Sequence, residues 1–88
     1  MKLRIRRRAK KELLDIDDDA TFFAIVKAML DLGEDPRPRG YDKVEGRDAI
    51  YRVWVGRDWR LLYSINPDRG ELTIEAVKKK AEGTYRQR

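Results

Sequence analysis

The sequence predicts a single α+β domain, residues 1–88, in which a two-helix hairpin packs on one face of an antiparallel sheet. Its 88 residues are enough for one domain with one modest hydrophobic core. Two stretches of the first half space their apolar residues with the period of a helix, whereas three stretches of the second half alternate apolar and polar residues as strands do. A short alternating stretch precedes the helices. The predicted element order is therefore β-α-α-β-β-β, a sandwich of two layers.

The chain begins with a predicted strand that leads into a helix. In residues 2–6, KLRIR, Leu3 and Ile5 are expected to face the core while the basic residues between them face solvent. The segment RRAKKELLDI then changes to helical spacing. Three of its apolar residues fall on roughly one side of that helix and are expected to be buried: Ala9, Leu13 and Ile16.

The second helix is expected within DDDATFFAIVKAMLDLG, residues 17–33. Three aspartates stand where this helix begins. They are expected to cap it and to favour the positive end of its dipole, rather than to bind a metal. Gly33 is a natural residue for the position just after the helix, and Pro36 prevents its continuation. The expected apolar stripe, including an aromatic pair in the core, consists of Phe22, Phe23, Ile25, Val26, Met29, Leu30 and Leu32.

Three strands are expected after a charged loop. Residues 34–49 are rich in proline, glycine and charge, which is typical either of a functional loop or of a solvated crossover. The predicted strands are YRVWV, WRLLYSI and ELTIEAV, joined by turns at GRD and NPDRG. Arg52 and Trp54 share one face of the first of these strands, opposite its core face, and Arg60 lies on the corresponding face of the second. On the last strand, the residues expected to alternate toward one face are Leu72, Ile74 and Ala76.

The composition excludes several kinds of chemistry. The chain has no cysteine, which removes disulfides and thiol nucleophiles, and no histidine, the commonest general acid/base and transition-metal ligand. Any catalysis must therefore use lysine, arginine, tyrosine, aspartate, glutamate, serine or threonine. No metal or cofactor is expected. No apolar run approaches the length of a membrane span or a signal sequence, so we expect a cytoplasmic protein without a membrane partner.

Positive charge is concentrated at the two ends of the sequence. The net charge is +5, with seven lysines and arginines against one glutamate in residues 1–12 and five against one in residues 76–88. On the sheet face away from the helices, Arg52, Arg60 and the lysines of the tail would form a basic surface that also holds Trp54. Cations bind phosphates and an indole stacks on unpaired bases, which favours RNA as a ligand. The same pattern is equally consistent with a solvated face whose charges protect the sheet.

A series of short motifs runs from the end of the second helix through the predicted hairpin. The motifs are Asp35-Pro36, Val44-Glu45-Gly46, Tyr51-Arg52, Val55-Gly56, Trp59-Arg60 and Leu61-Leu62-Tyr63. Together with the element order and the basic tail, they resemble the RelE/ParE superfamily of bacterial and archaeal toxins. The turn between the helices, LLDIDDDA, is short and has no aromatic residue, which is more similar to the RelE branch than to the ParE branch.

This resemblance implies a function and partners. RelE-like toxins cleave mRNA in the ribosomal A site and are neutralised by an antitoxin, whereas ParE-like toxins poison DNA gyrase. The implied reaction is attack of an RNA 2′-hydroxyl on the adjacent phosphate, without a metal. The implied partner is an antitoxin with an acidic helical segment, which forms a hetero-oligomer with the toxin. Two alternatives stay open: a ParE-like gyrase inhibitor, and a degenerate relative that only binds its antitoxin.

The resemblance also implies four catalytic residues. Arg52 occupies a strand position that is basic in the family and would clamp a phosphate. Arg60 would stabilise the charge of the transition state. Lys79 stands where an arginine is common and would contact the leaving-group side, although the change to lysine loses the bidentate fork. Tyr85 stands where a terminal tyrosine carries a proton or stacks on a base.

Three further residues are expected to bind RNA: Trp54, Lys78 and Lys80. Trp54 replaces a second basic residue of many relatives, which removes a cation and supplies a stacking surface, and it is equally suited to burial under an antitoxin helix. The lysines would also help Tyr85, because the ordinary pKa of tyrosine, about 10, is too high for a base at neutral pH.

A purely structural role is open for the same side chains. Arg52 and Arg60 are also placed to pair with Glu71 or Glu75 across the sheet. Tyr85 is also suited to holding the tail against the sheet. Under that interpretation the arginines stabilise the fold and bind no RNA.

Overall fold

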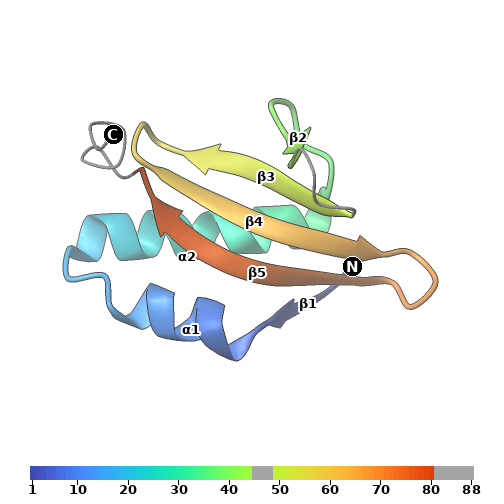
Figure 1. Ribbon diagram of the computed structural model, residues 1–88, viewed down its shortest axis with the longest axis horizontal. Coiled ribbons are helices and arrows are strands. Elements are labelled where there is room, and N and C mark those ends of the chain that lie inside the picture. The colour runs from blue at the N-terminus through green and yellow to red at the C-terminus, as the bar shows by residue number, and fades with distance from the viewer. Residues whose placement is uncertain (45–48, 81–88) are drawn as a thin grey trace, which may run out of the picture.

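The computed structural model describes residues 1–44 and 49–80, and within these ranges it has two helices and one five-stranded sheet. The strand order in the sheet is β1-β5-β4-β3-β2. In Figure 1, α2 lies behind the strands and α1 lies alongside β5, so the fold has a sheet layer and a helix layer. The predicted α+β class is confirmed. The elements are β1 (Lys2–Ile5), α1 (Arg7–Leu14), α2 (Asp19–Glu34), β2 (Asp42–Lys43), β3 (Ile50–Val55), β4 (Trp59–Asn66) and β5 (Glu71–Lys79).

The sheet is mixed, not wholly antiparallel as predicted. The pairs β2–β3, β3–β4 and β4–β5 are antiparallel, but β1 pairs with β5 in the parallel direction, with Leu3 opposite Leu72 and Ile5 opposite Ile74. Alternation of apolar residues indicates a strand, but it carries no information on the direction in which that strand pairs. The short strand β2 lies inside the segment that the sequence predicts as loop, residues 34–49.

The core forms between the helices and one face of the sheet, and its centre is Tyr63, which has no exposed surface. The Tyr63 hydroxyl donates a hydrogen bond of 2.8 Å to the carbonyl oxygen of Pro36. This bond fastens the segment after α2 to the middle of β4. The other buried apolar residues of this core are Ala9, Leu13, Ile25, Met29, Leu32, Leu61, Leu72, Ile74 and Val77.

Several residues predicted to lie in the core are exposed instead. Phe23 is 65% exposed, Leu30 is 59% exposed and Ile5 is 41% exposed. Phe23 stands about 200° around the helix from the buried Ile25, so a single buried stripe of α2 cannot include both residues. Phe22 is half-buried and packs against the core, so the aromatic pair is only partly a core element.

Helix α2 begins as predicted, with an aspartate cap, but it does not end at the predicted residue. Asp18 caps the helix, because its carboxylate accepts a 2.9 Å hydrogen bond from the backbone N–H of Thr21. Gly33 was expected just after the helix, but α2 continues to Glu34 and Gly33 is buried within it. There the carbonyl oxygen of Gly33 accepts a 2.9 Å hydrogen bond from the terminal ammonium of Met1, which fixes the start of β1 against the helix.

The last strand contains a β-bulge that changes which side chains reach each face. Leu62 lies opposite Ala76, but the next residue of β4, Tyr63, lies opposite Ile74, so Glu75 is an extra residue in β5. An extra residue inverts the alternation on one side of the bulge. Val77 therefore faces the core, although uninterrupted alternation from Leu72 predicts that position 77 faces away.

Neither helix is long and apolar enough to cross a membrane, within the residues that the structure describes.

Replacing Tyr63 with phenylalanine tests the anchor between β4 and the segment after α2. Burial raises the pKa of Tyr63 to about 12, above the ordinary value of about 10. Because the folded-state pKa is raised, the unfolded chain ionises first, and stability falls as pH rises from about 10 to 12.

In urea unfolding, we expect Tyr63→Phe to lower the free energy of unfolding by about 1–2 kcal/mol at pH 7 through the lost hydrogen bond. Between pH 10 and 12 its unfolding free energy falls less steeply than that of the unmodified chain. Parallel pH curves would contradict the buried, neutral hydroxyl.

Candidate nucleic-acid interface

The sheet face opposite the helices carries a row of three side chains from three neighbouring strands. Trp54 of β3 lies opposite Arg60 of β4, and Arg60 lies opposite Lys78 of β5. Cross-strand partners point to the same face of a sheet. This row is called the cleavage row below, after the function that is proposed for it in the next subsection. Arg52 lies two residues before Trp54 and therefore shares its face. Four of the predicted site residues are thus brought together on the open face.

The indole of Trp54 lies between two guanidinium groups. The Cζ atoms of Arg52 and Arg60 are each 5.9 Å from the centre of the Trp54 ring. These distances are within the range of cation–π attraction, so the arginines orient the ring and the ring holds the arginines. Trp54 remains 42% exposed. An exposed aromatic ring between two cations presents a stacking surface next to groups that bind phosphate.

Arg52 is held by a carboxylate that the sequence analysis did not single out. Its Nε and Nη2 donate to the two carboxylate oxygens of Asp42, at 3.2 and 2.9 Å. The short strand β2 places Asp42 directly opposite Arg52. The position of Asp42 inside a predicted loop hid this pairing, because no periodic pattern indicates a two-residue strand.

The sequence left open that Arg52 and Arg60 form ion pairs with Glu71 or Glu75. No such ion pair occurs among the residues that the structure describes. Both glutamates are occupied elsewhere, and Arg60 has no ion pair within residues 1–44 and 49–80. The partners of the two glutamates are Arg4, Arg69, Arg6 and Ser64. Among the residues that the structure describes, the guanidinium of Arg60 is held by its contact with the indole and by no carboxylate.

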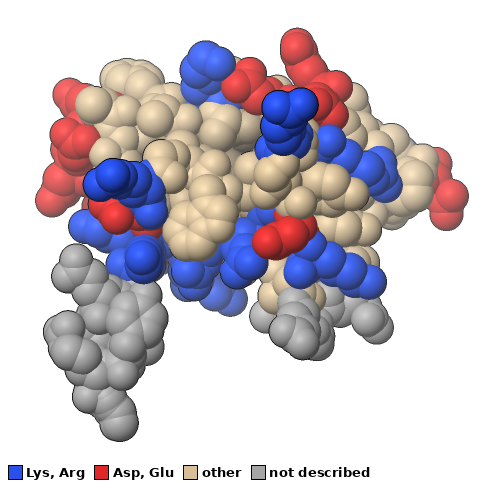
Figure 2. Space-filling view, turned by 90° about the horizontal axis from the view of Figure 1, so that it is seen from above, with Lys and Arg blue, Asp and Glu red and all other residues tan. Residues whose placement is uncertain are grey.

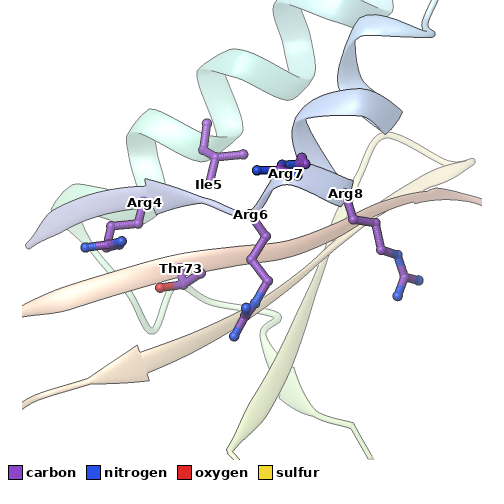
Figure 3. A pocket seen from close by; sticks show the side chains of 6 residues that line it. All are labelled: Arg4, Ile5, Arg6, Arg7, Arg8 and Thr73. Carbon is purple, nitrogen blue, oxygen red and sulfur yellow. The ribbon is translucent and has the colours of Figure 1, made fainter.

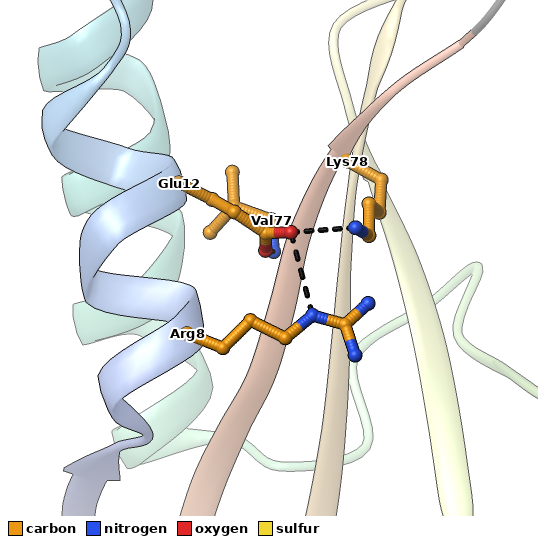
Figure 4. A network of polar contacts seen from close by, with 4 residues as sticks. All are labelled: Arg8, Glu12, Val77 and Lys78. Atoms are coloured by element: carbon orange, nitrogen blue, oxygen red, sulfur yellow. Dashed lines mark hydrogen bonds and ion pairs between the residues drawn. The ribbon is translucent and has the colours of Figure 1, made fainter.

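Lys78 is joined to α1 through one carboxylate, that of Glu12 (Figure 4). Glu12 Oε1 accepts a 2.8 Å hydrogen bond from the backbone N–H of Val77, and Oε2 accepts one of 2.5 Å from Lys78 Nζ. Oε2 also lies 3.5 Å from Arg8 Nε. The Val77 N–H lies on the edge of β5 beyond the end of β1, so Glu12 satisfies a donor that has no strand partner.

The pKa of Glu12 is set by opposing effects. Partial burial raises it, but the hydrogen bonds from Lys78, Val77 and Arg8, together with the charge of Lys78, outweigh burial and leave the pKa below its ordinary value of 4.5. Glu12 is therefore an anion at neutral pH, and its hydrogen bond positions the Lys78 side chain on the open face.

Lys79 does not lie with the other predicted catalytic residues. Its ammonium nitrogen is 6.0 Å from the centre of the ring of Trp59, which packs against the hydrophobic core on the helix side of the sheet. The bulge at Glu75 is the cause, since it moves Lys78 to the open face and Lys79 to the helix face. The expected grouping of Lys79 with Arg52 and Arg60 is wrong.

The two remaining predicted residues lie at or beyond the end of β5. Lys80 is exposed, and its backbone N–H donates to the carbonyl oxygen of Asp58 at 2.6 Å. Tyr85 lies outside the residues that the structure describes.

The space-filling view shows how charge is distributed on one side of the molecule. Blue lysine and arginine side chains gather along the lower margin of Figure 2, with one group of acidic atoms among them. This margin is the side to which the open face of Figure 1 turns. A surface of this kind attracts polyanions. No group of three or more carboxylates suited to a metal occurs within the described residues.

Comparisons with known proteins give a clear result for the fold. No family model and no curated protein matches the sequence. Among solved structures, the RelE–RelB complex from the archaeon Pyrococcus horikoshii matches with a TM-score of 0.76 and 24% identity, covering 92% of this chain and 96% of that chain. The toxin–antitoxin complex RelBE2 from Mycobacterium tuberculosis matches with a TM-score of 0.75 and 22% identity, covering 89% of this chain and 95% of that chain.

A toxin structure without a partner matches in the same way. The isolated RelE toxin from E. coli has a TM-score of 0.74 and 21% identity to this chain, covering 96% of this chain and 90% of that chain. The chain therefore has the RelE fold over nearly its whole length. The fold implied by the sequence motifs is confirmed.

Replacing Glu12 with glutamine tests the carboxylate that joins α1 to β5. Because the folded-state pKa of Glu12 is lowered, its contribution to stability is present above pH 4.5 and is lost as pH falls through the folded-state value. Glu12→Gln removes this contribution at all pH values. We expect its unfolding free energy at pH 7 to be about 1–2 kcal/mol lower, and the difference from the unmodified chain to shrink below pH 4.5. Glu34→Gln, at an exposed position, serves as the control. A difference that is independent of pH would contradict the proposed charge interaction.

Proposed function

We propose that this chain is the toxin of a type II toxin–antitoxin pair and that it cleaves mRNA on the ribosome, as RelE-like toxins do. The proposal is supported by the RelE fold, the motifs of the predicted hairpin, and the open face. The observation that carries it is the cleavage row, in which an indole and two cations lie side by side on three strands. A stacking ring next to cations suits a single-stranded polyanion better than an apolar ligand.

The reaction is transfer of a phosphate from the 5′-oxygen of one nucleotide to the 2′-oxygen of the preceding one. The 2′-hydroxyl loses its proton and attacks the adjacent phosphorus, a phosphorane with extra negative charge forms, and the bond to the 5′-oxygen breaks. The leaving oxygen then takes up a proton. The protein must therefore supply a base, positive charge and an acid.

Arg60 has the position that charge stabilisation requires. It is the central member of the cleavage row, and a phosphate that reaches it displaces no carboxylate of residues 1–44 and 49–80. Its planar guanidinium can donate two parallel hydrogen bonds to phosphate oxygens. Arg52, held beside it across the indole, would bind the neighbouring phosphate once Asp42 is displaced.

Lys78 replaces Lys79 as the residue proposed for the leaving group. It lies on the open face next to Arg60, whereas Lys79 lies on the other face. Glu12 positions its ammonium group through a 2.5 Å hydrogen bond, and an ammonium beside the 5′-oxygen is a proton donor for an alkoxide. The removal of the 2′ proton is assigned, as a prediction from the sequence motifs, to Tyr85.

An antitoxin with an acidic segment is the proposed protein partner. Such a segment would cover the open face and the free edge of β1, and it would block RNA by occupying the same cations. Partner and substrate would compete for one surface, so the hetero-oligomer would be inactive.

One observation favours a second function, a chain that binds its antitoxin and does not cleave RNA. Arg52 and Lys78 are already paired with Asp42 and Glu12, so two of the cations are neutralised in the free chain. Many RelE-like relatives carry a basic residue where this sequence has Trp54. The free energy gained by binding a phosphate at Arg52 or Lys78 must therefore exceed the cost of displacing the carboxylate.

Replacing Arg60 with alanine tests the proposed ribonuclease directly. The unmodified chain, induced in cells, is expected to arrest growth and to create new mRNA 5′ ends within translated codons. Loss of one charge-stabilising group typically slows a reaction by about 10²–10³-fold, so Arg60→Ala should abolish both effects at equal expression. Mapping of mRNA 5′ ends provides the measurement.

Arg39→Ala, which removes one exposed cation of the loop after α2, is the matched control and should remain toxic. Growth arrest without new 5′ ends would assign the toxicity to another target, such as gyrase. Absence of arrest, with retained binding to the antitoxin, would establish the binding-only function.

A further inference from the structure

A second basic feature lies apart from the cleavage row, where β1 passes into α1. It is a pocket of about 530 Å³ whose wall is mostly arginine (Figure 3). The mechanism proposed above makes no use of it. The residues that line the pocket are Arg4, Ile5, Arg6, Arg7, Arg8 and Thr73.

Three of these arginines form a line on one side of the chain. Figure 3 shows the side chains of Arg4, Arg6 and Arg8 projecting toward the same side, while Ile5 projects to the opposite side. They are called the arginine row below. Arg4 lies in β1, Arg6 is the residue between β1 and α1, and Arg8 lies in the first turn of α1. Arg4 is opposite Thr73 in the parallel register, so the row follows β5 on the open face.

Each arginine of the row is positioned by a carboxylate beneath it. The side chains of Arg4, Arg6 and Arg8 are 57, 63 and 64% exposed, whereas their carboxylate partners are only 14, 18 and 22% exposed. The partners are Glu71, Glu75 and Glu12.

These contacts leave most of each guanidinium free to bind a further anion. Arg6 and Arg8 reach their carboxylates through Nε. No hydrogen bond to another described residue uses their terminal Nη groups, and a guanidinium has five N–H donors. No acidic residue occurs in the first turn of α1, so the helix dipole adds to the positive potential around the pocket.

The arginine row continues the surface of the cleavage row. Glu12 contacts both Arg8 and Lys78, which are the neighbouring ends of the two rows. The far end, Arg4, is opposite Thr73, five residues before Lys78, which corresponds to about 16 Å along the strand. One extended polyanion can therefore contact both rows.

We propose that the arginine row binds the phosphates of the RNA segment that extends beyond the cleavage row. This inference rests on RNA as the ligand of the proposed function, and it adds a second binding site to it. RNA is favoured over an acidic protein segment because Ile5 is the only apolar residue among the described residues that line the pocket. Docking of a protein segment depends on apolar anchors, whereas phosphates need only guanidinium donors.

The salt dependence of RNA binding tests this site. For single-stranded RNA, log K falls linearly with log salt, and each phosphate contact that is removed lowers the steepness of this slope by about 0.7. The variant Arg4→Gln, Arg6→Gln, Arg8→Gln is therefore expected to lower the slope by about 2 for an RNA of about 12 nucleotides. For an RNA of about 4 nucleotides, which is too short to reach both rows, the expected change is less than half of this.

Two further variants control for charge and folding. Lys27→Gln, Arg37→Gln, Arg39→Gln removes the same number of exposed cations from other surfaces and should leave the slope within about 0.5 of the unmodified value. The triple arginine-to-lysine variant keeps the charge of the row and should keep most of the slope. Thermal unfolding of each variant identifies any loss of binding that comes from loss of the fold.

The outcomes separate this site from the proposed function. Equal slopes for the row variant and the control variant would overturn the arginine row as a site, even if the chain cleaves mRNA. The predicted slope change in a chain that does not cleave mRNA would remove the proposed enzyme and leave the site. Absence of RNA binding by the unmodified chain, or loss of binding to an acidic peptide with unchanged binding to RNA, would also overturn the site.

Discussion

The bulge at Glu75 is the constraint on which the open face of this protein depends. One extra residue in β5 inverts the alternation of the strand, so Val77 completes the core and Lys78 joins Trp54 and Arg60 on the open face. Without the bulge, Lys79 would occupy that face and Val77 would leave the core. The same extra residue, Glu75, binds Arg6 and Ser64. A single irregularity thus supplies both a cation of the cleavage row and an anchor of the arginine row.

Carboxylates organise the cations of the open face. Asp42 holds Arg52 and Glu12 holds Lys78, while Arg60 is oriented by the ring of Trp54 and has no ion pair within the described residues. Surface ion pairs contribute little to stability, about 0–1 kcal/mol each. Their larger effect here is geometric, because each one restricts a long side chain to one position. The face is thereby ordered in the free chain, and the cations that are paired with carboxylates would have to exchange partners to bind the proposed RNA.

Much of the fold could be predicted from the sequence because periodicity reports burial. The helical stripe of Ile25, Met29 and Leu32 and the alternation of Leu61 and Tyr63 follow directly from which residues are apolar. The exposed Phe23 shows the limit of this reasoning, since an apolar residue in a helix need not lie on its buried face. The parallel pairing of β1 could not be predicted from the pattern within β1, because strand direction is decided by contacts between residues that are distant in the sequence.

Alternation along the strands also predicted part of the candidate site. Arg52, Trp54 and Arg60 lie in regular strands, where alternation assigns the face correctly. Lys79 was assigned to the wrong face because a bulge leaves no consistent trace in one sequence. The sequence did not indicate that Glu12 pairs with Lys78 or that Asp42 pairs with Arg52. Both pairs join residues of different elements, and no local pattern shows which elements lie side by side. The motifs similar to RelE-like toxins indicated the fold, but not which of two neighbouring lysines lies on the open face.

The most direct test of this account compares Lys78→Ala with Lys79→Ala in single-turnover cleavage of mRNA on programmed ribosomes. The two variants remove the same charge one residue apart, and both are checked for folding by thermal unfolding. The account predicts that Lys78→Ala slows cleavage by about 10²-fold or more, while Lys79→Ala changes the rate by less than about 10-fold. A large loss in Lys79→Ala with near-normal cleavage by Lys78→Ala would contradict the assignment of the open face.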